Sequence, residues 1–155
     1  MGKAVEIVKR LVELYNDGTT EEYGSDNFLE LFAPDADWAE MPSFMFPSGR
    51  TIDDETIRES LMHCNKMLRN RRLELNEVIE KGNVVAWRAV WSAAVAVDRP
   101  DGLPIKAGSR IQVHMAVFTE VIDDLIVRQH EYLSNPEIGM SGRIALDSTL
   151  SIIKG

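Results

Sequence analysis

The sequence predicts an α+β fold in which helices come first and a bent antiparallel sheet wraps around them. Residues 3–16 place apolar side chains three and four positions apart, which is the period of a helix that buries one face. Residues 84–97, 109–121 and 125–133 have the character of strands and are separated by short turn-forming clusters, so they predict an antiparallel meander. Residues 73–80 add a further strand before them. Helices followed by strands define the α+β class, and helices packed on one face of a curved sheet form an apolar cup.

The length and composition describe one globular domain. The 155 residues are 45% apolar and 27% charged, which allows a sizeable core. The formal net charge of -8 argues against partners that present phosphate, namely nucleic acid and anionic membranes. The single cysteine, Cys64, excludes an internal disulfide and fits a reducing, cytoplasmic location. No apolar run reaches the roughly 18 residues of a spanning helix, and charges interrupt the N-terminus where a signal peptide would be apolar.

The segment around residue 40 organises the expected fold. A short helix over residues 27–32 precedes a strand over residues 37–41, and this strand ends at Pro42. A loop then turns at Gly49, and a second long helix is expected over residues 53–68, with acidic residues in its first turn.

Trp38 and Glu40 share one side of the short strand, because side chains alternate between the two faces of a strand. The rest of the chain is interpreted as walls around this pair. The following loop carries Phe44, Met45 and Phe46, which would be a sticky patch on a monomer and is expected to cover a cavity or a partner subunit.

The long strands have one apolar face and one mixed face. The mixed face, which includes Arg110 and His114, suits either a polar-lined pocket or a subunit interface. Three arginines between residues 69 and 72 are interpreted as a solvated junction. The domain is expected to cover residues 1–135, with residues 125–133 as its last strand. Residues 136–155 are then a tail that begins with a flexible connector at 139–142 and packs on the domain or on a partner, which favours a homodimer.

Three stretches of this pattern resemble the NTF2-like superfamily, in particular its SnoaL-like cyclase, scytalone dehydratase and ketosteroid isomerase branches. They are Leu-Phe-Ala-Pro-Asp-Ala-Asp-Trp-Ala-Glu-Met-Pro at residues 31–42, the meander of long strands, and the closing segment from Asp123 to Ser134. The resemblance covers residues 3–136. It implies a cone-shaped barrel in which a strongly bent sheet wraps around a long helix, a deep apolar pocket, and frequent dimerisation.

The chain departs from the isomerase branch at the positions that carry its chemistry. The turn before the last strand is Asp123-Asp124, without the usual glycine. The position of the isomerase base holds Met41, with the acid one residue earlier at Glu40, and the isomerase tyrosine falls near Leu11 rather than Tyr15. The resemblance places the first acid of the family's last strand on Glu131.

A carboxylate or imidazole in an apolar cavity has its pKa moved toward neutrality, so it can take a proton from a carbon next to a carbonyl. The candidate acids and bases are Glu40, His114, Glu131 and His130, with Glu40 and His114 as the leading pair and Glu131 and His130 as the next. The position of His114 also resembles a strand histidine of scytalone dehydratase-like proteins. The alternative for each residue is a surface or interface position. The expected substrate-binding residues are Tyr15, Trp38, Met41, Phe46, Trp87, Trp91, Arg110 and Met115, with plain core packing as the alternative for the tryptophans.

These observations predict a cofactor-free isomerase or lyase that acts on a polycyclic molecule of polyketide or terpenoid type. The sequence holds no nucleotide-binding loop and no nucleophile elbow, and His63, His114 and His130 lack the spacing of metal ligands. The alternative is a binding or dimerisation module without catalysis. A buried acid close to a histidine would favour the enzyme, and a dry pocket without ionisable groups would favour the module.

Overall fold

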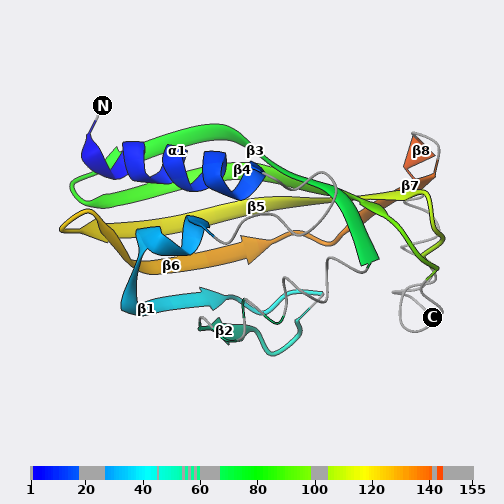
Figure 1. The fold of residues 1–155 in the computed structure, drawn as a ribbon, viewed down its shortest axis with the longest axis horizontal. Helices are drawn as coiled ribbons and strands as arrows, with labels where there is room; N and C mark the ends of the chain where they lie inside the picture. Colours follow the sequence, from blue (N-terminus) through cyan, green and yellow to red (C-terminus); the bar gives the residue numbers. More distant parts are fainter. Residues whose placement is uncertain are drawn as a thin grey trace.

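One α-helix lies against one face of a large curved sheet (Figure 1). The computed structural model describes residues 2–17, 27–44, 46–53, 55, 57, 59, 67–98, 105–140 and 143–144. Within these residues the chain forms the helix α1 (Lys3–Asn16), the 3-10 helix η1 (Asn27–Leu31) and eight strands: β1 (Phe32–Glu40), β2 (Arg50–Ile52), β3 (Leu68–Lys81), β4 (Val84–Val95), β5 (Ser109–Ile122), β6 (Leu125–Leu133), β7 (Glu137–Met140) and β8 (Arg143–Ile144). This confirms the predicted α+β class.

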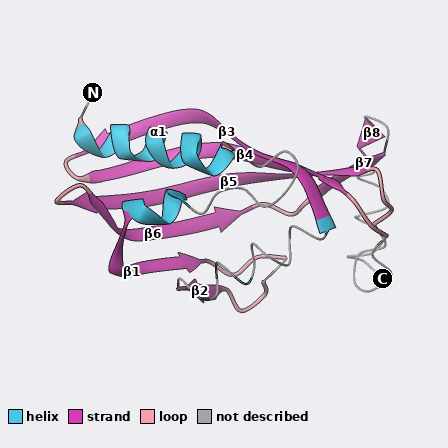
Figure 2. Cartoon of the chain, viewed as in Figure 1, coloured by secondary structure: helices cyan, strands magenta, loops and turns pink. Residues whose placement is uncertain are grey.

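The strands follow the order β2-β1-β6-β5-β4-β3 in one sheet, and β7 pairs with β5 and β8. The meander β3-β4-β5-β6 is antiparallel, as predicted. The pairing of β1 with β6 is parallel, so the sheet is mixed rather than wholly antiparallel. The sheet curves around α1 without closing, because β2 and β3 end the order at opposite edges (Figure 2).

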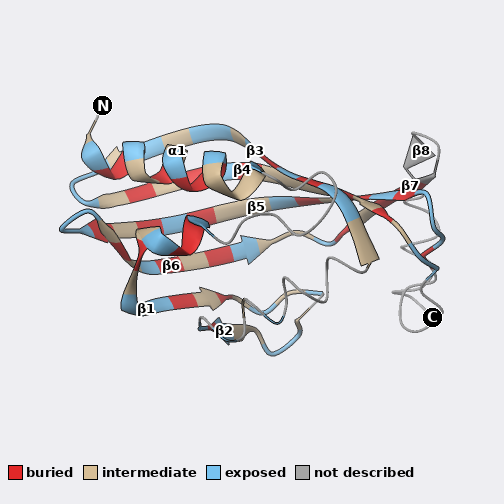
Figure 3. Cartoon of the chain, in the orientation of Figure 1, coloured by how far each residue is buried: buried red, intermediate tan, exposed pale blue. Residues whose placement is uncertain are grey.

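The helix α1 forms where its apolar period predicted it, and its inward side is buried (Figure 3). The side chain of Asn16 ties the end of the helix to β3. Its Nδ2 donates to the carbonyl of Leu73 at 2.8 Å, and its Oδ1 accepts from the backbone N–H of Leu73 at 2.7 Å. One amide thus satisfies both backbone groups of a strand residue, which fixes the helix across the sheet. The glycine predicted to stop the helix, Gly18, lies outside the described residues.

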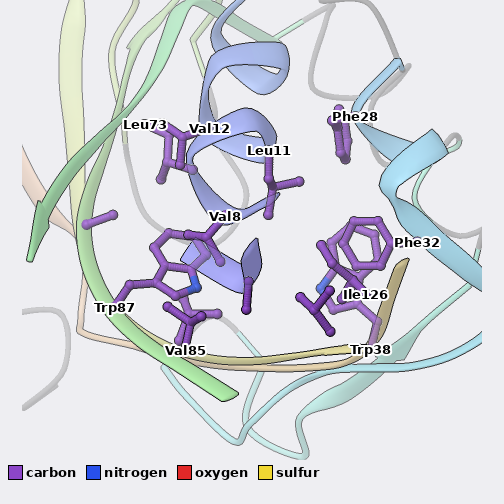
Figure 4. Packing of buried hydrophobic residues seen from close by; sticks show 14 of the residues in the cluster. Val8, Leu11, Val12, Phe28, Phe32, Trp38, Leu73, Val85, Trp87 and Ile126 are labelled. Atoms are coloured by element: carbon purple, nitrogen blue, oxygen red, sulfur yellow. The ribbon is translucent and has the colours of Figure 1, made fainter. Parts of the chain in front are cut away.

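The main core fills the space between α1, η1 and the sheet (Figure 4). Phe32 stacks on Trp38 with ring centroids 4.4 Å apart. A second cluster lies toward β7 and consists of Val95, Ile105, Ile111, Val113 and Ile138. The half-buried side chains of Trp91 and Met115 pack against both clusters, so these two residues lie at the boundary between the clusters.

The second predicted helix, over residues 53–68, is confirmed at the described residues 55, 57, 59 and 67, which are helical. Its first turn is present, because the N–H of Ile57 donates to the carbonyl of Asp53 at 2.9 Å. Strand β3 begins at Leu68, so the prediction extends one residue too far. The middle of that predicted helix, with His63 and Cys64, lies outside the described residues.

The interpretation of residues 69–72 as a solvated junction is wrong for Arg71. The pairing of β3 with β4 shifts between Arg69 and Arg72, and Asn70 has a φ of 52°. Such a bulge redirects the side chain next to it. Arg71 is consequently 5% exposed, with its guanidinium carbon 5.8 Å from the centre of the Tyr15 ring.

The chain also continues as sheet beyond residue 133. Strand β7 pairs with β5, with Ile111 opposite Ile138, and Ile138 is buried in the second cluster. The prediction of a flexible connector is therefore wrong for Gly139 and Met140, which lie in β7. Strand β2 was likewise not expected. Residues 145–155, the rest of the predicted tail, and the turn predicted at 99–102 lie outside the described residues.

Candidate active site

Neighbouring strands bring two glutamates and an arginine into one row. In the parallel pairing Glu40 of β1 lies beside Glu131 of β6, and in the antiparallel pairing Arg50 of β2 lies beside Glu40. The ladder continues past the end of β1, because the N–H of Met41 donates to the carbonyl of Glu131 at 2.8 Å. Both carboxylates are buried, at 8% and 6% exposure, on the face of the sheet that carries Trp38. When two acids lie side by side in an apolar interior, the charge of one disfavours the ionisation of the other.

Arg50 neutralises one of the two acids. Its Nε donates to Oε2 of Glu40 at 2.8 Å and its terminal nitrogen donates to Oε1 at 2.9 Å, so the contact is bidentate. The guanidinium carbon also lies 4.1 Å from the centre of the Phe46 ring. Planar contacts on two sides hold the guanidinium in one orientation, which leaves Glu40 as a fixed, paired carboxylate.

Glu131 lies in a different environment, because its hydrogen-bond partners are neutral. The indole Nε1 of Trp38 donates to Oε2 at 2.5 Å, and Nε2 of Gln129 donates to the same oxygen at 3.1 Å. Burial is the largest influence on this carboxyl and Glu40 the second, and together they raise the pKa of Glu131 to about 7. The two hydrogen bonds and the charge of Arg50 act in the opposite direction. Since both donors occupy Oε2, Oε1 is the oxygen that these two hydrogen bonds leave available for the titrating proton.

Two further buried side chains, Trp87 and Thr119, extend this network into the sheet. The indole Nε1 of Trp87 on β4 donates to Oγ1 of Thr119 on β5 at 3.0 Å. The hydroxyl of Thr119 donates to Oε1 of Gln129 on β6, also at 3.0 Å. The network therefore runs from Trp87 through Thr119 and Gln129 to Glu131, across three adjacent strands.

Aromatic side chains form the inner surface around this network. The indole Nε1 of Trp91 donates to the hydroxyl of Tyr15 at 2.7 Å, and the Tyr15 ring meets Phe28 edge to face at 5.6 Å. In Figure 4, Trp87 and Trp38 lie on opposite sides of α1 against the curved sheet. A pocket of about 280 Å³ lies beside Trp38 and is also lined by Phe32, Ala33, Pro34, Ala36, Ile52, Asp53 and Glu55. Trp38 connects the two features: its ring lines this pocket and its indole N–H donates to Glu131, which does not itself line the pocket.

Both predicted acid–histidine pairs are wrong. His114 is exposed on the outer face of β5, where its Nε2 lies 3.3 Å from Oε1 of Glu137, whereas Glu40 is inside. His130 lies on the outer face of β6, with Nε2 2.9 Å from Oδ2 of Asp37, opposite in parity to Glu131. The physical reason is the alternation of strand side chains, which sends the even-numbered residues of β5 and those from Arg128 to Tyr132 in β6 outward.

The other predicted site residues divide in the same way. Trp38 and Trp87 are buried, Tyr15, Trp91 and Met115 are half-buried in the interior, and Met41 and Phe46 are half-buried beside the glutamate row. Arg110 is exposed on the outer face with His114, so its predicted place in the pocket is wrong. The site residues missed by sequence reasoning are Arg50, Thr119 and Gln129. Gln129 shares the parity of Glu131, which was a usable signal.

Among the described residues, no group of three or more His, Cys, Asp and Glu side chains is placed to hold a metal ion. No helix within the described part of the chain is both long and apolar enough to cross a membrane.

Comparison with known proteins agrees with this architecture. Residues 8–129, more than half of the chain, match the sequence model of the SnoaL-like domain. No curated protein matches the chain by sequence.

Several solved structures share the fold. Wild-type IdmH from Streptomyces antibioticus, provisionally named a polyketide cyclase, is 18% identical with a TM-score of 0.68 over 99% of this chain and 100% of that chain. PrhC from Penicillium brasilianum is 15% identical with a TM-score of 0.65 over 98% and 86%. A protein from Jannaschia, provisionally named a SnoaL-like polyketide cyclase, is 14% identical with a TM-score of 0.62 over 99% and 92%. At these identities the likeness concerns the fold.

Proposed function

The chain belongs to the SnoaL-like family, and we propose that it is an isomerase or lyase that works by general acid–base catalysis without a cofactor. The proposed substrate is a hydrophobic, polycyclic small molecule of polyketide or terpenoid type. One observation carries the proposal: Glu131 is a buried carboxyl with a pKa of about 7 beside a second, paired glutamate. A carboxyl with this pKa exists in both protonation states near neutral pH, which suits both halves of a proton-transfer reaction.

The proposed step begins with ionised Glu131. Its Oε1 takes a proton from a carbon next to a substrate carbonyl, the C–H bond breaks, and its electron pair moves to the carbonyl oxygen as an enolate. In a substrate with a C=C bond conjugated to the enolate, the protonated carboxyl returns the proton to the far carbon of that bond, which completes an isomerisation. In a substrate with a β-hydroxyl, the enolate re-forms the carbonyl, the C–O bond breaks, and the proton goes to the leaving hydroxyl, which completes a dehydration as water departs. Trp38 and Gln129 hold Oε2 still throughout, and the fixed pair of Glu40 with Arg50 keeps a charge nearby.

The interior supports the substrate class. Trp38 and Phe32 line the pocket of about 280 Å³ and offer ring surface to a flat apolar molecule, and Trp87, Trp91 and Tyr15 form the packed aromatic interior behind them. Structural neighbours named as polyketide cyclases favour the same class.

We further propose that the protein is a homodimer that pairs through the outer face of the sheet. There Phe118 and Tyr132 meet edge to face at 6.0 Å, and both are 48% exposed. Light scattering at high micromolar concentration that gives the monomer mass of 17.5 kDa would contradict the dimer.

Deuterium exchange tests the acid–base role without knowledge of the natural substrate. A panel of polycyclic ketones is incubated in D2O with the protein, and deuterium uptake next to the carbonyl is followed by mass spectrometry. We expect at least one ketone to exchange faster with the protein than in buffer, and Glu131→Gln to lower that rate by about 100- to 10,000-fold. Glu74→Gln, an exposed glutamate on β3, is the matched control and should exchange at the wild-type rate.

Exchange by Glu131→Gln at the wild-type rate would refute the role of Glu131. Tight binding of several ketones with no exchange by the wild-type protein would instead favour the alternative function, a binding module.

A further inference from the structure

We propose that Trp87 and Thr119 are positioning residues that fix which end of the Gln129 amide faces Glu131. The inference deepens the proposed function, because its consequence depends on Glu131 being the acid–base group. Both residues reach that carboxyl through an intermediary: Trp87 lies on β4 and Thr119 on β5, with Gln129 between them and Glu131.

The direction of the network follows from the chemistry of its first member. An indole N–H donates and cannot accept, so Oγ1 of Thr119 must accept from Trp87. The single hydroxyl hydrogen of Thr119 then points to Oε1 of Gln129 at 3.0 Å. With its carbonyl oxygen engaged, Gln129 presents its NH2 group to Oε2 of Glu131 at 3.1 Å. The indole fills one of the two lone pairs of Oγ1 and the hydroxyl hydrogen goes to Gln129, so the network favours the orientation in which Glu131 meets a donor and not a second oxygen.

Burial makes this orientation persistent. Trp87 and Gln129 are each 3% exposed and Thr119 is fully buried. A reversed amide would leave the buried hydroxyl hydrogen of Thr119 without its acceptor and would place the amide carbonyl oxygen against the Glu131 carboxylate. Reversal would therefore remove a hydrogen bond that favours the ionised carboxylate and add a repulsion that disfavours it.

The other charged groups that face Glu131 are distinct from this network. Within the described residues they are Glu40 on β1 and Arg50 on β2, which pair with each other. Their ion pair lies on β1 and β2, on one side of β6, whereas Thr119 and Trp87 lie on β5 and β4, on the other side of β6. A substitution at Thr119 should consequently change the titration of Glu131 through Gln129 alone.

The test measures the titration of Glu131 directly, in the full chain labelled with carbon-13 at the glutamate carboxyls. Thr119→Val removes the hydroxyl at nearly constant volume, and Thr119→Ser restores it. Gln129→Met removes the amide and calibrates the loss of its hydrogen bond. Thr51→Val, on the exposed side of β2, is the matched control for the threonine change.

We expect Thr119→Val and Gln129→Met each to raise the pKa of Glu131 by about one to two units, which is the size of one hydrogen bond to a charged group. Thr119→Ser and Thr51→Val should leave it at the wild-type value. The NH2 resonances of Gln129 should lose their nuclear Overhauser contact with the Trp38 indole N–H in Thr119→Val only. If Thr119→Val does not fold, Trp87→Phe replaces it, with the same expected direction.

An unchanged pKa of Glu131 in the folded Thr119→Val protein, or in Trp87→Phe when that variant replaces it, would overturn the inference. Failure of the proposed function gives a different pattern. If the pKa moves as expected but Glu131→Gln exchanges deuterium at the wild-type rate, the positioning role stands and the catalytic role falls. If Glu131→Gln abolishes exchange while Thr119→Val titrates as wild type, only the positioning role falls.

Discussion

Substitution of Glu131 by glutamine should make the protein more stable at alkaline pH, even though it removes a proposed catalytic group. The folded protein raises the pKa of Glu131 from 4.5 to about 7, so the folded chain binds this proton more tightly than the unfolded chain. The associated stability is present below pH 4.5 and is lost as the pH rises through 7. The difference of about 2.5 pKa units corresponds to roughly 3 kcal/mol of unfolding free energy, at about 1.4 kcal/mol for each unit. A glutamine side chain cannot ionise, so the Glu131→Gln variant does not bear this loss.

Urea unfolding of both proteins at pH 5 and pH 8.5 measures the effect. Between these two pH values the stability of the variant relative to wild type should rise by about 2 to 3 kcal/mol, because other titrating groups are common to both proteins and cancel. Glu74→Gln should show no such change, since that carboxyl is exposed. A difference between Glu131→Gln and wild type that is the same at both pH values would refute the conclusion that Glu131 titrates near neutrality in the folded state.

Four further predictions concern two turns, the Arg50–Glu40 ion pair and the outer face of the sheet. Asp124→Gly should stabilise the protein by up to about 1 kcal/mol in thermal melts, because its φ of 67° suits glycine. Gly82→Ala should lower the unfolding free energy by about 1 kcal/mol, because Gly82 has a φ of 61° and the added methyl group meets no other atom. Equal melting temperatures for Asp124→Gly and Gly82→Ala would contradict this argument from backbone conformation. Arg50→Met should lower the unfolding free energy by about 1 to 3 kcal/mol, because it leaves the buried Glu40 without its bidentate partner, and adding Glu40→Gln should recover part of that loss in urea titrations. The rate of deuterium exchange in His114→Ala should lie within about twofold of wild type, since the His114 side chain lies on the outer face of the sheet. A loss of rate as large as that expected on removal of a general base would instead support a catalytic role for His114.

The parts of the fold that depend on local pattern could be predicted from the sequence. The helical period of α1 and the alternation of β4, β5 and β6 can be recognised from neighbouring residues alone, and the structure confirms these elements to within a few positions. The bulge at Asn70 could not be read in this way. It arises from a backbone conformation that glycine would have signalled, and it turns Arg71 from an expected solvated residue into a buried one.

The site depended on information that no local pattern contains. The alternation of odd and even positions along β6 predicts that Glu131 and His130 lie on opposite faces, but it does not say which face of the sheet is concave. The pairing of β1 with β6 decides that question, because it puts Glu40 next to Glu131 and leaves His114 outside. Arg50 was not recognised because a strand as short as β2, with three residues, carries no detectable alternation.

The parallel pairing of β1 with β6 also has a consequence for how the chain is made. Trp38 and Glu131 are 93 residues apart, so the contact between them closes a long loop and contributes to a high contact order. During synthesis β1 and β2 leave the ribosome early, while β6, which pairs with the inner edge of β1, emerges only after β3, β4 and β5. Until β6 emerges, the apolar side of β1, with Phe32 and Trp38, is without its final cover and can bind chaperones or aggregate. A nascent chain can therefore form the hairpins of β3, β4 and β5, whereas the carboxylate pair exists only once translation has passed Glu131.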